Sequence, residues 1–114
     1  MGDTGLRVWV ADEPAERSQG LKDLRGLPGD IDGMLFVFPD PSVPTFVMEE
    51  TRFALDLWFF DADGVLIGIE EMSPCSSGDC PSFPAPAEVG WALETALGVF
   101  EFEEGEVLST SGSG

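Results

Sequence analysis

The chain has 114 residues, 43% of them hydrophobic, and 22 acidic against five basic side chains give it a formal net charge of −17. This length corresponds to one domain with its own core. The charge opposes binding to nucleic acid or anionic lipid, because both require cations that displace counterions. The sequence contains no apolar run of about 18 residues, so we expect no membrane span.

The beginning of the chain predicts one strand followed by one helix. Residues 6–11 alternate in character and are rich in Val and Trp, which is typical of a strand. Residues 12–24 have a helical pattern, in which Pro14 fits the first helical position and Glu16 suits the positive end of the helix dipole. Gly20 weakens this helix, so we expect it to be short.

The stretch 33–72 is the most apolar part of the chain, and the rest is organised around it. It predicts short strands at 34–38, 45–48, 55–60 and 65–72. Three prolines, Pro39, Pro41 and Pro44, predict an extended loop after the first of these strands, because proline lacks a backbone donor. Asp61 to Gly64 has the Asp-Gly signature of a tight hairpin.

The last part of the chain is harder to interpret from periodicity. Residues 73–86 predict a loop, and 88–95 fit either a strand, which we favour, or a helical turn. Residues 99–102 and 106–108 could then close the sheet.

These elements predict a mainly β (α+β) fold. We expect a small single-domain β-barrel or sandwich-like sheet with one short N-terminal helix and a long Pro-rich loop. Residues 6–108 would form one compact domain, and 109–114 a flexible tail or linker.

Most common catalytic arrangements are missing from the sequence. The chain has no His, which excludes Ser–His and Cys–His nucleophile pairs and any zinc site that needs His. It has no glycine-rich phosphate loop. We therefore expect no cofactor.

Cys75 and Cys80 are separated by four intervening residues in a loop rich in Ser, Gly and Pro. We favour a local disulfide, which would indicate an oxidising compartment. Two free thiols are the second interpretation. A redox pair is the third, since such pairs usually have two intervening residues at a helix start.

Asp61, Asp63 and Gly64 resemble the start of a calcium loop, but no further ligands follow at the required spacing. We favour a hairpin turn and expect no metal, with Asp61 and Asp63 as the weak candidates for one.

Acidic residues are the remaining candidates for chemistry. Asp56 lies in an apolar strand, where a carboxylate is either solvated or buried and paired. We favour a structural pair with Arg17, Arg52 being the other candidate, and we keep Asp56 and Glu49 as candidate catalytic acids. A carboxylate pair for acid/base work could come from Glu49, Glu50, Glu70 and Glu71.

Taken in order, several motifs resemble one known family. These are VADEPAERSQGL, GMLFVF, FVMEET, LDLWFFDADG, MSPC with a later CP, and a late ALE. Together they resemble the uncharacterised family called domain of unknown function 192, over residues 6–108. The resemblance implies a compact β-rich domain, often exported or lipid-anchored, with no activity to carry over. Matching positions make Arg17, Met48, Thr51 and Asp56 the candidate binding residues.

The chain departs from the family pattern at two places. Lys22 stands where the family usually has Met, and Glu49 and Glu50 stand where it has a basic or amide residue. The part after Leu97 also looks shortened. If the family ligand is anionic, the two acidic residues would weaken its binding.

These observations favour a non-catalytic exported or surface module, a monomer that binds an unknown protein or small ligand. The alternative is a carboxylate-based hydrolase that acts on glycan or cell-wall polymer. The charge of −17 fits either a salt-loving source, where salt screens the repulsion between like charges, or an acidic protein from an ordinary organism. The location would then be extracytoplasmic or, alternatively, the cytoplasm of a halophile.

Overall fold

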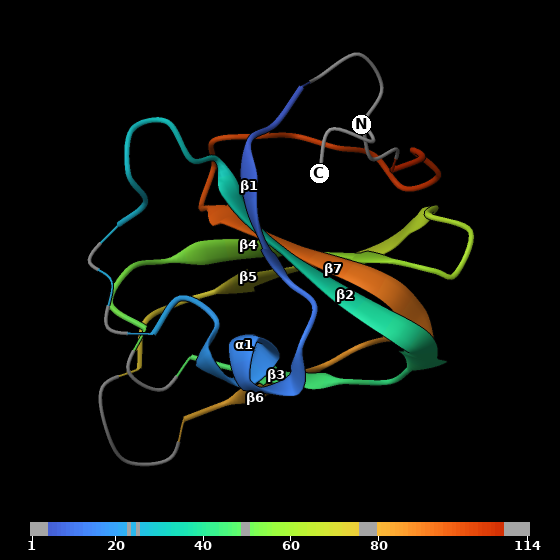
Figure 1. The fold of residues 1–114 in the computed structure, drawn as a ribbon. Coiled ribbons are helices and arrows are strands. Elements are labelled where there is room, and N and C mark those ends of the chain that lie inside the picture. The colour runs from blue at the N-terminus through green and yellow to red at the C-terminus, as the bar shows by residue number, and fades with distance from the viewer. Residues whose placement is uncertain (1–4, 23, 25, 49–50, 76–79, 109–114) are drawn as a thin grey trace.

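A computed structural model describes residues 5–22, 24, 26–48, 51–75 and 80–108 of the chain. Its centre is a five-stranded sheet with strand order β1-β2-β7-β4-β5 (Figure 1). A two-stranded ribbon, β3-β6, and one short helix, α1, complete the fold. The element bounds are β1 Val8–Ala11, α1 Pro14–Gln19, β2 Gly33–Ser42, β3 Thr45–Val47, β4 Leu55–Phe60, β5 Leu66–Met72, β6 Ser82–Pro84 and β7 Val89–Ala96.

The mainly β fold with one short early helix is confirmed. β1 pairs with β2 in parallel, and α1 lies in the connection between them. All other pairs in the sheet are antiparallel. The sheet is open, with β1 and β5 at its edges, so it is barrel-like only loosely.

The two faces of the sheet carry separate cores because side chains alternate along each strand. One face packs Phe36, Leu57 and Phe59 beneath α1 and the ribbon. The other face packs Leu35, Trp58 and Leu93 beneath the C-terminal segment, which contributes Phe102 (Figure 1). All six residues of β4 are buried, since both of its faces are covered.

Three sequence predictions about strands were wrong. β2 continues through Pro39 and Pro41, where a loop was predicted. The pairing of β2 with β7 is irregular between Val37 and Ser42, and proline is tolerated in such a stretch because it needs no backbone N–H for the sheet there. β6 lies inside the predicted loop 73–86. Residues 99–102 and 106–108 do not form strands, and an isolated bridge between Val65 and Val107 is their one ladder contact among the described residues.

The predicted hairpin turn and disulfide are both present. Asp61 Oδ1 accepts hydrogen bonds from the backbone N–H groups of Asp63 and Val65, at 2.9 and 3.0 Å. Gly64, at φ 81°, completes the turn. Cys75 and Cys80 are bonded to each other.

No helix in the described part of the chain is long and apolar enough to cross a membrane. The predicted flexible tail at 109–114 lies outside the described residues.

Candidate functional site

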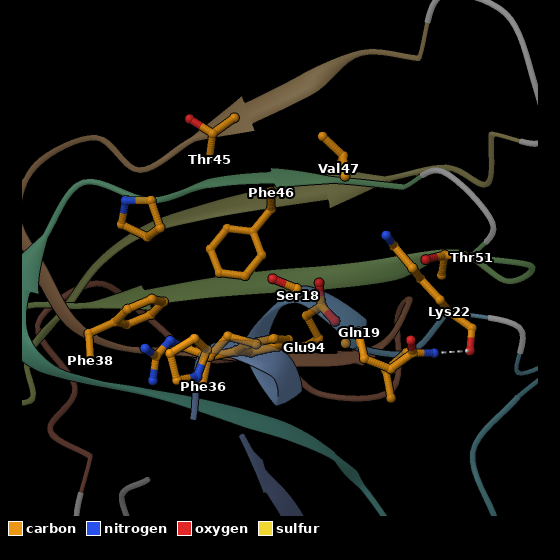
Figure 2. Close-up of a pocket in the computed structure, with 15 residues that line it drawn as sticks. Ser18, Gln19, Lys22, Phe36, Phe38, Thr45, Phe46, Val47, Thr51 and Glu94 are labelled. Atoms are coloured by element: carbon orange, nitrogen blue, oxygen red, sulfur yellow. Dashed lines mark hydrogen bonds between the residues drawn. The ribbon is translucent and has the colours of Figure 1, made fainter. Parts of the chain in front are cut away.

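A pocket of about 480 Å³ lies between α1, the sheet and β3 (Figure 2). Phe46 reaches into this space from β3, while Phe36 and Glu94 enter it from the sheet. The remaining lining residues come mainly from α1, the turn after it and the ribbon: Pro14, Arg17, Ser18, Gln19, Gly20, Leu21, Lys22, Phe38, Pro44, Thr45, Val47 and Thr51. A volume of this size fits a small organic ligand.

The wall formed by α1 is fixed at both helix ends. Pro14 begins the helix, and the Glu16 carboxylate accepts the backbone N–H groups of Asp12 and Glu13, each at 3.2 Å. Gly20 ends it at φ 50°, a conformation that other residues rarely adopt. A Cβ at Gly20 would lie 3.6 Å from Phe36 Cζ and 4.0 Å from Glu94 Oε1, so this glycine lets the helix end lie close to the sheet.

Arg17 connects α1 to β2. Its Nη1 donates a hydrogen bond to the carbonyl of Val37 at 3.0 Å, and its guanidinium lies 5.5 Å from the ring centroid of Phe38. The side chain is half-buried at the pocket wall. These contacts hold Arg17 in place without a carboxylate.

Three aromatic rings make one side of the pocket apolar. The ring of Phe46 meets those of Phe36 and Phe38 edge-on, with centroid distances of 5.2 and 6.5 Å. Edge-to-face contacts of this kind stabilise beyond the buried area alone. These rings pack against one another and form the apolar side of the pocket.

Glu94 is the unusual group in this pocket. It lies on β7 between Leu93 and Thr95, is only 4% exposed, and pairs in register with Leu57 on β4 and Met34 on β2. Within the described part of the chain, no group donates a hydrogen bond to its carboxyl. Burial raises the pKa of this carboxyl from the ordinary 4.5 to about 8. At neutral pH, this raised pKa keeps the Glu94 carboxyl mostly protonated.

Asp56 lies on the opposite face of the sheet from Glu94. It pairs in register with Thr95, and its Oδ2 accepts the backbone N–H of Gly98 at 2.9 Å. The predicted pair between Arg17 and Asp56 was wrong. Arg17 comes from α1, which covers the face toward which Leu55 and Leu57 point, whereas Asp56 points the other way.

The other predicted site residues divide between the pocket and the core. Thr51 is buried, lines the pocket and donates its backbone N–H to the carbonyl of Met48 at 3.0 Å. Met48 is fully buried in the core. Asp61 and Asp63 belong to the hairpin turn, and the described residues contain no group of three or more side chains that could hold a metal ion. Glu49 lies outside the described residues.

Sequence reasoning did not select Glu94 as a site residue. The sequence did contain a signal, because Glu94 follows Ala92 and Leu93 inside an apolar strand. Asp56 has a similar position between Leu55 and Leu57. What the sequence did not reveal was which strand face α1 would cover.

The family comparison agrees with the motifs noted in the sequence. The model of DUF192, described as Uncharacterized ACR, matches residues 1–109. The chain belongs to DUF192. No curated protein matches this DUF192 chain.

Two solved structures are similar to this DUF192 chain, each at 28% identity. One is a putative transcription regulator from Sinorhizobium meliloti 1021, with a TM-score of 0.67 over 78% of this chain and 67% of that one. The other is a protein of unknown function from Novosphingobium aromaticivorans DSM 12444, with a TM-score of 0.69 over 79% of this chain and 62% of that one. The chain thus spans about two thirds of the length of each.

Proposed function

We propose that this protein is a small-ligand-binding module, and that the pocket under α1 is its binding site. The observation that carries the proposal is Glu94, a buried carboxyl without a hydrogen-bond donor among the described residues, facing a pocket of about 480 Å³. Among the described residues, no side-chain oxygen or nitrogen is both fully shielded and without a hydrogen-bond partner, so the Glu94 oxygens remain accessible from the pocket. A ligand in the pocket can therefore reach this carboxyl and form a hydrogen bond with it.

We also propose that the module works outside the cytoplasm. The disulfide between Cys75 and Cys80 supports this, because such bonds persist in oxidising compartments. The cytoplasm of a halophile is the alternative location. Immunoblotting of fractionated source cells tests the location, and a purely cytoplasmic signal would contradict export.

A carboxylate-based hydrolase of glycan is the second candidate. One observation favours it, since a pKa of about 8 would keep Glu94 protonated as a general acid at neutral pH. Such an enzyme needs a second carboxylate nearby. Within the described part of the chain, Glu94 is the acidic residue that lines this pocket, and Asp56 lies on the opposite face of the sheet. The arrangement therefore supports binding better than hydrolysis.

The Sinorhizobium protein carries the name of a transcription regulator, but a DNA-binding role is disfavoured for this chain. A net charge of −17 repels the phosphate backbone that supplies most of the affinity of DNA-binding proteins.

A fragment screen by ligand-observed NMR tests the binding proposal. Ser18 is exposed on α1 and lines this pocket, whereas Val10 is exposed on β1 and lines a separate hollow. Ser18→Trp should therefore abolish binding of the hits, whereas Val10→Trp, which also adds a large side chain, should leave it unchanged. Hits that bind Ser18→Trp as well as the wild type, or a library without hits, would contradict the proposal.

A further inference from the structure

One acidic group, Glu94, faces the pocket within its described lining. Arg17 and Lys22 are the basic residues among its described lining. Arg17 is held by the Val37 carbonyl and the Phe38 ring. Burial is the cause of the raised pKa of the Glu94 carboxyl.

The aromatic wall lies next to this carboxyl. The position of a Cβ at Gly20 is 3.6 Å from Phe36 Cζ and 4.0 Å from Glu94 Oε1, so an atom of a ligand in the neighbouring space can approach both. Phe46 packs against Phe36 and extends the apolar surface. A carboxylate bordered by aromatic rings is the chemistry that binds a cation attached to an apolar body, by a charge-assisted hydrogen bond and by attraction to the rings.

We propose, on the basis of the proposed binding function, that the ligand is a small organic amine in its ammonium form. Its charge pairs with the Glu94 carboxylate, and its apolar part packs against Phe36 and Phe46. The class includes primary amines with one aromatic or aliphatic ring, which a pocket of about 480 Å³ can hold.

The charge of the whole protein supports a cation over an anion. With 22 acidic and five basic side chains, the surface field attracts cations and repels carboxylates and phosphates. Within the described lining, Arg17 and Lys22 both carry a positive charge that opposes an ammonium ligand, and Arg17 also holds α1 to β2 through Val37. Removal of the Lys22 charge should therefore strengthen amine binding.

The binding must ionise Glu94, which makes affinity depend on pH. With a pKa of about 8, about one molecule in ten has the charged carboxylate at pH 7. Amine affinity should therefore rise about tenfold from pH 6 to pH 7 and level off above pH 8. At pH 7 each binding event should release close to one proton, since the empty site holds it.

Isothermal titration with matched probes tests this inference. Benzylamine, phenethylamine and cyclohexylmethylamine are compared with the alcohols and carboxylic acids of the same carbon skeletons, at pH 6, 7 and 8. Two buffers of different ionisation enthalpy report the released proton. At least one amine should bind, at least tenfold more tightly than its alcohol and acid counterparts.

Three variants separate the contributions. Glu94→Gln keeps the shape of the side chain and should weaken amine binding at least tenfold and remove its pH dependence. Glu88→Gln makes the same substitution at an exposed position just before β7 and should change the affinity less than twofold. Lys22→Met should strengthen amine binding.

Two results would overturn the inference. One is preferential binding of the acids that weakens as pH rises, because Glu94 would then act as a neutral hydrogen-bond donor to an anion. The other is a failure of every amine to bind although the fragment screen yields ligands that Ser18→Trp excludes. In both cases the pocket would remain a binding site, whereas a library without hits would contradict the proposed function itself.

Discussion

Replacing Glu94 with glutamine should change how the stability of the free protein depends on pH. Below pH 4.5 the carboxyl is protonated in both the folded and the unfolded chain. Between about 4.5 and 8 the unfolded chain loses this proton while the folded chain keeps it, so the free energy of unfolding falls as pH rises. Above pH 8 both forms are ionised and the loss is complete. The amide introduced by Glu94→Gln does not titrate, so the variant should lack this contribution.

The expected size follows from the raised pKa of Glu94. A shift from 4.5 to about 8 corresponds to about 5 kcal/mol over the whole range. Between pH 6 and pH 8, the part easiest to measure, the wild type should lose about 2 kcal/mol more than Glu94→Gln. For a domain of this size the loss corresponds to a decrease in Tm of about 8 °C.

Urea unfolding followed by tryptophan fluorescence, from pH 5 to pH 8.5 in high salt, measures the effect. The quantity of interest is the difference between wild type and variant at each pH, because the contributions of the other ionisable groups cancel in it. Glu88→Gln is the matched control and should have the wild-type slope. Parallel curves for wild type and Glu94→Gln would refute the argument, since they would mean that the buried carboxyl titrates alike in both states.

Three further predictions concern the surface, the loop and the sheet. The Tm should rise in molar KCl by more than in sucrose of equal osmolality, because salt also screens a net charge of −17; an equal rise would remove the argument from charge. Alkylation without reductant should leave the intact mass unchanged, since Cys75 and Cys80 are bonded, and two added groups would contradict this. Gly33→Ala should destabilise the fold by about 3 kcal/mol in urea, because a Cβ there would lie 2.2 Å from the Glu94 carbonyl oxygen, whereas Gly29→Ala, with open space around it, should have little effect.

The parts of the fold with strong local signals could be predicted from the sequence. β4 has the predicted bounds, because six consecutive apolar or buried residues stand between a polar connection and an Asp-Gly turn. The early helix was predicted, but it is shorter than the expected 12–24, since Gly20 ends it at a positive φ. Turn chemistry and proline geometry act within a few residues, so they are visible without knowledge of distant contacts.

The parts that depend on distant contacts could not be predicted. β6 exists because Phe83 pairs with Phe46 across the ribbon, and nothing near Phe83 in sequence reveals this partner. Residues 99–102 have the composition of a strand, yet Phe100 and Phe102 stack on each other and cover Trp58 instead of extending the sheet. The strand propensity of these residues indicated that they would be buried, but not that they would be buried outside a strand.

The candidate site shows the same limit at the scale of one residue. Asp56 and Glu94 are both carboxylates within apolar strands, and the sequence offers each the same two interpretations. Their register differs by one position, because Asp56 pairs with Thr95 and Glu94 pairs with Leu57. Since neighbouring residues on a strand point to opposite faces, this single step places Asp56 where a backbone N–H satisfies it and Glu94 in the pocket under α1. The difference between the surroundings of the two acids therefore lies in strand register and in the face that the helix covers, which only the assembled sheet determines.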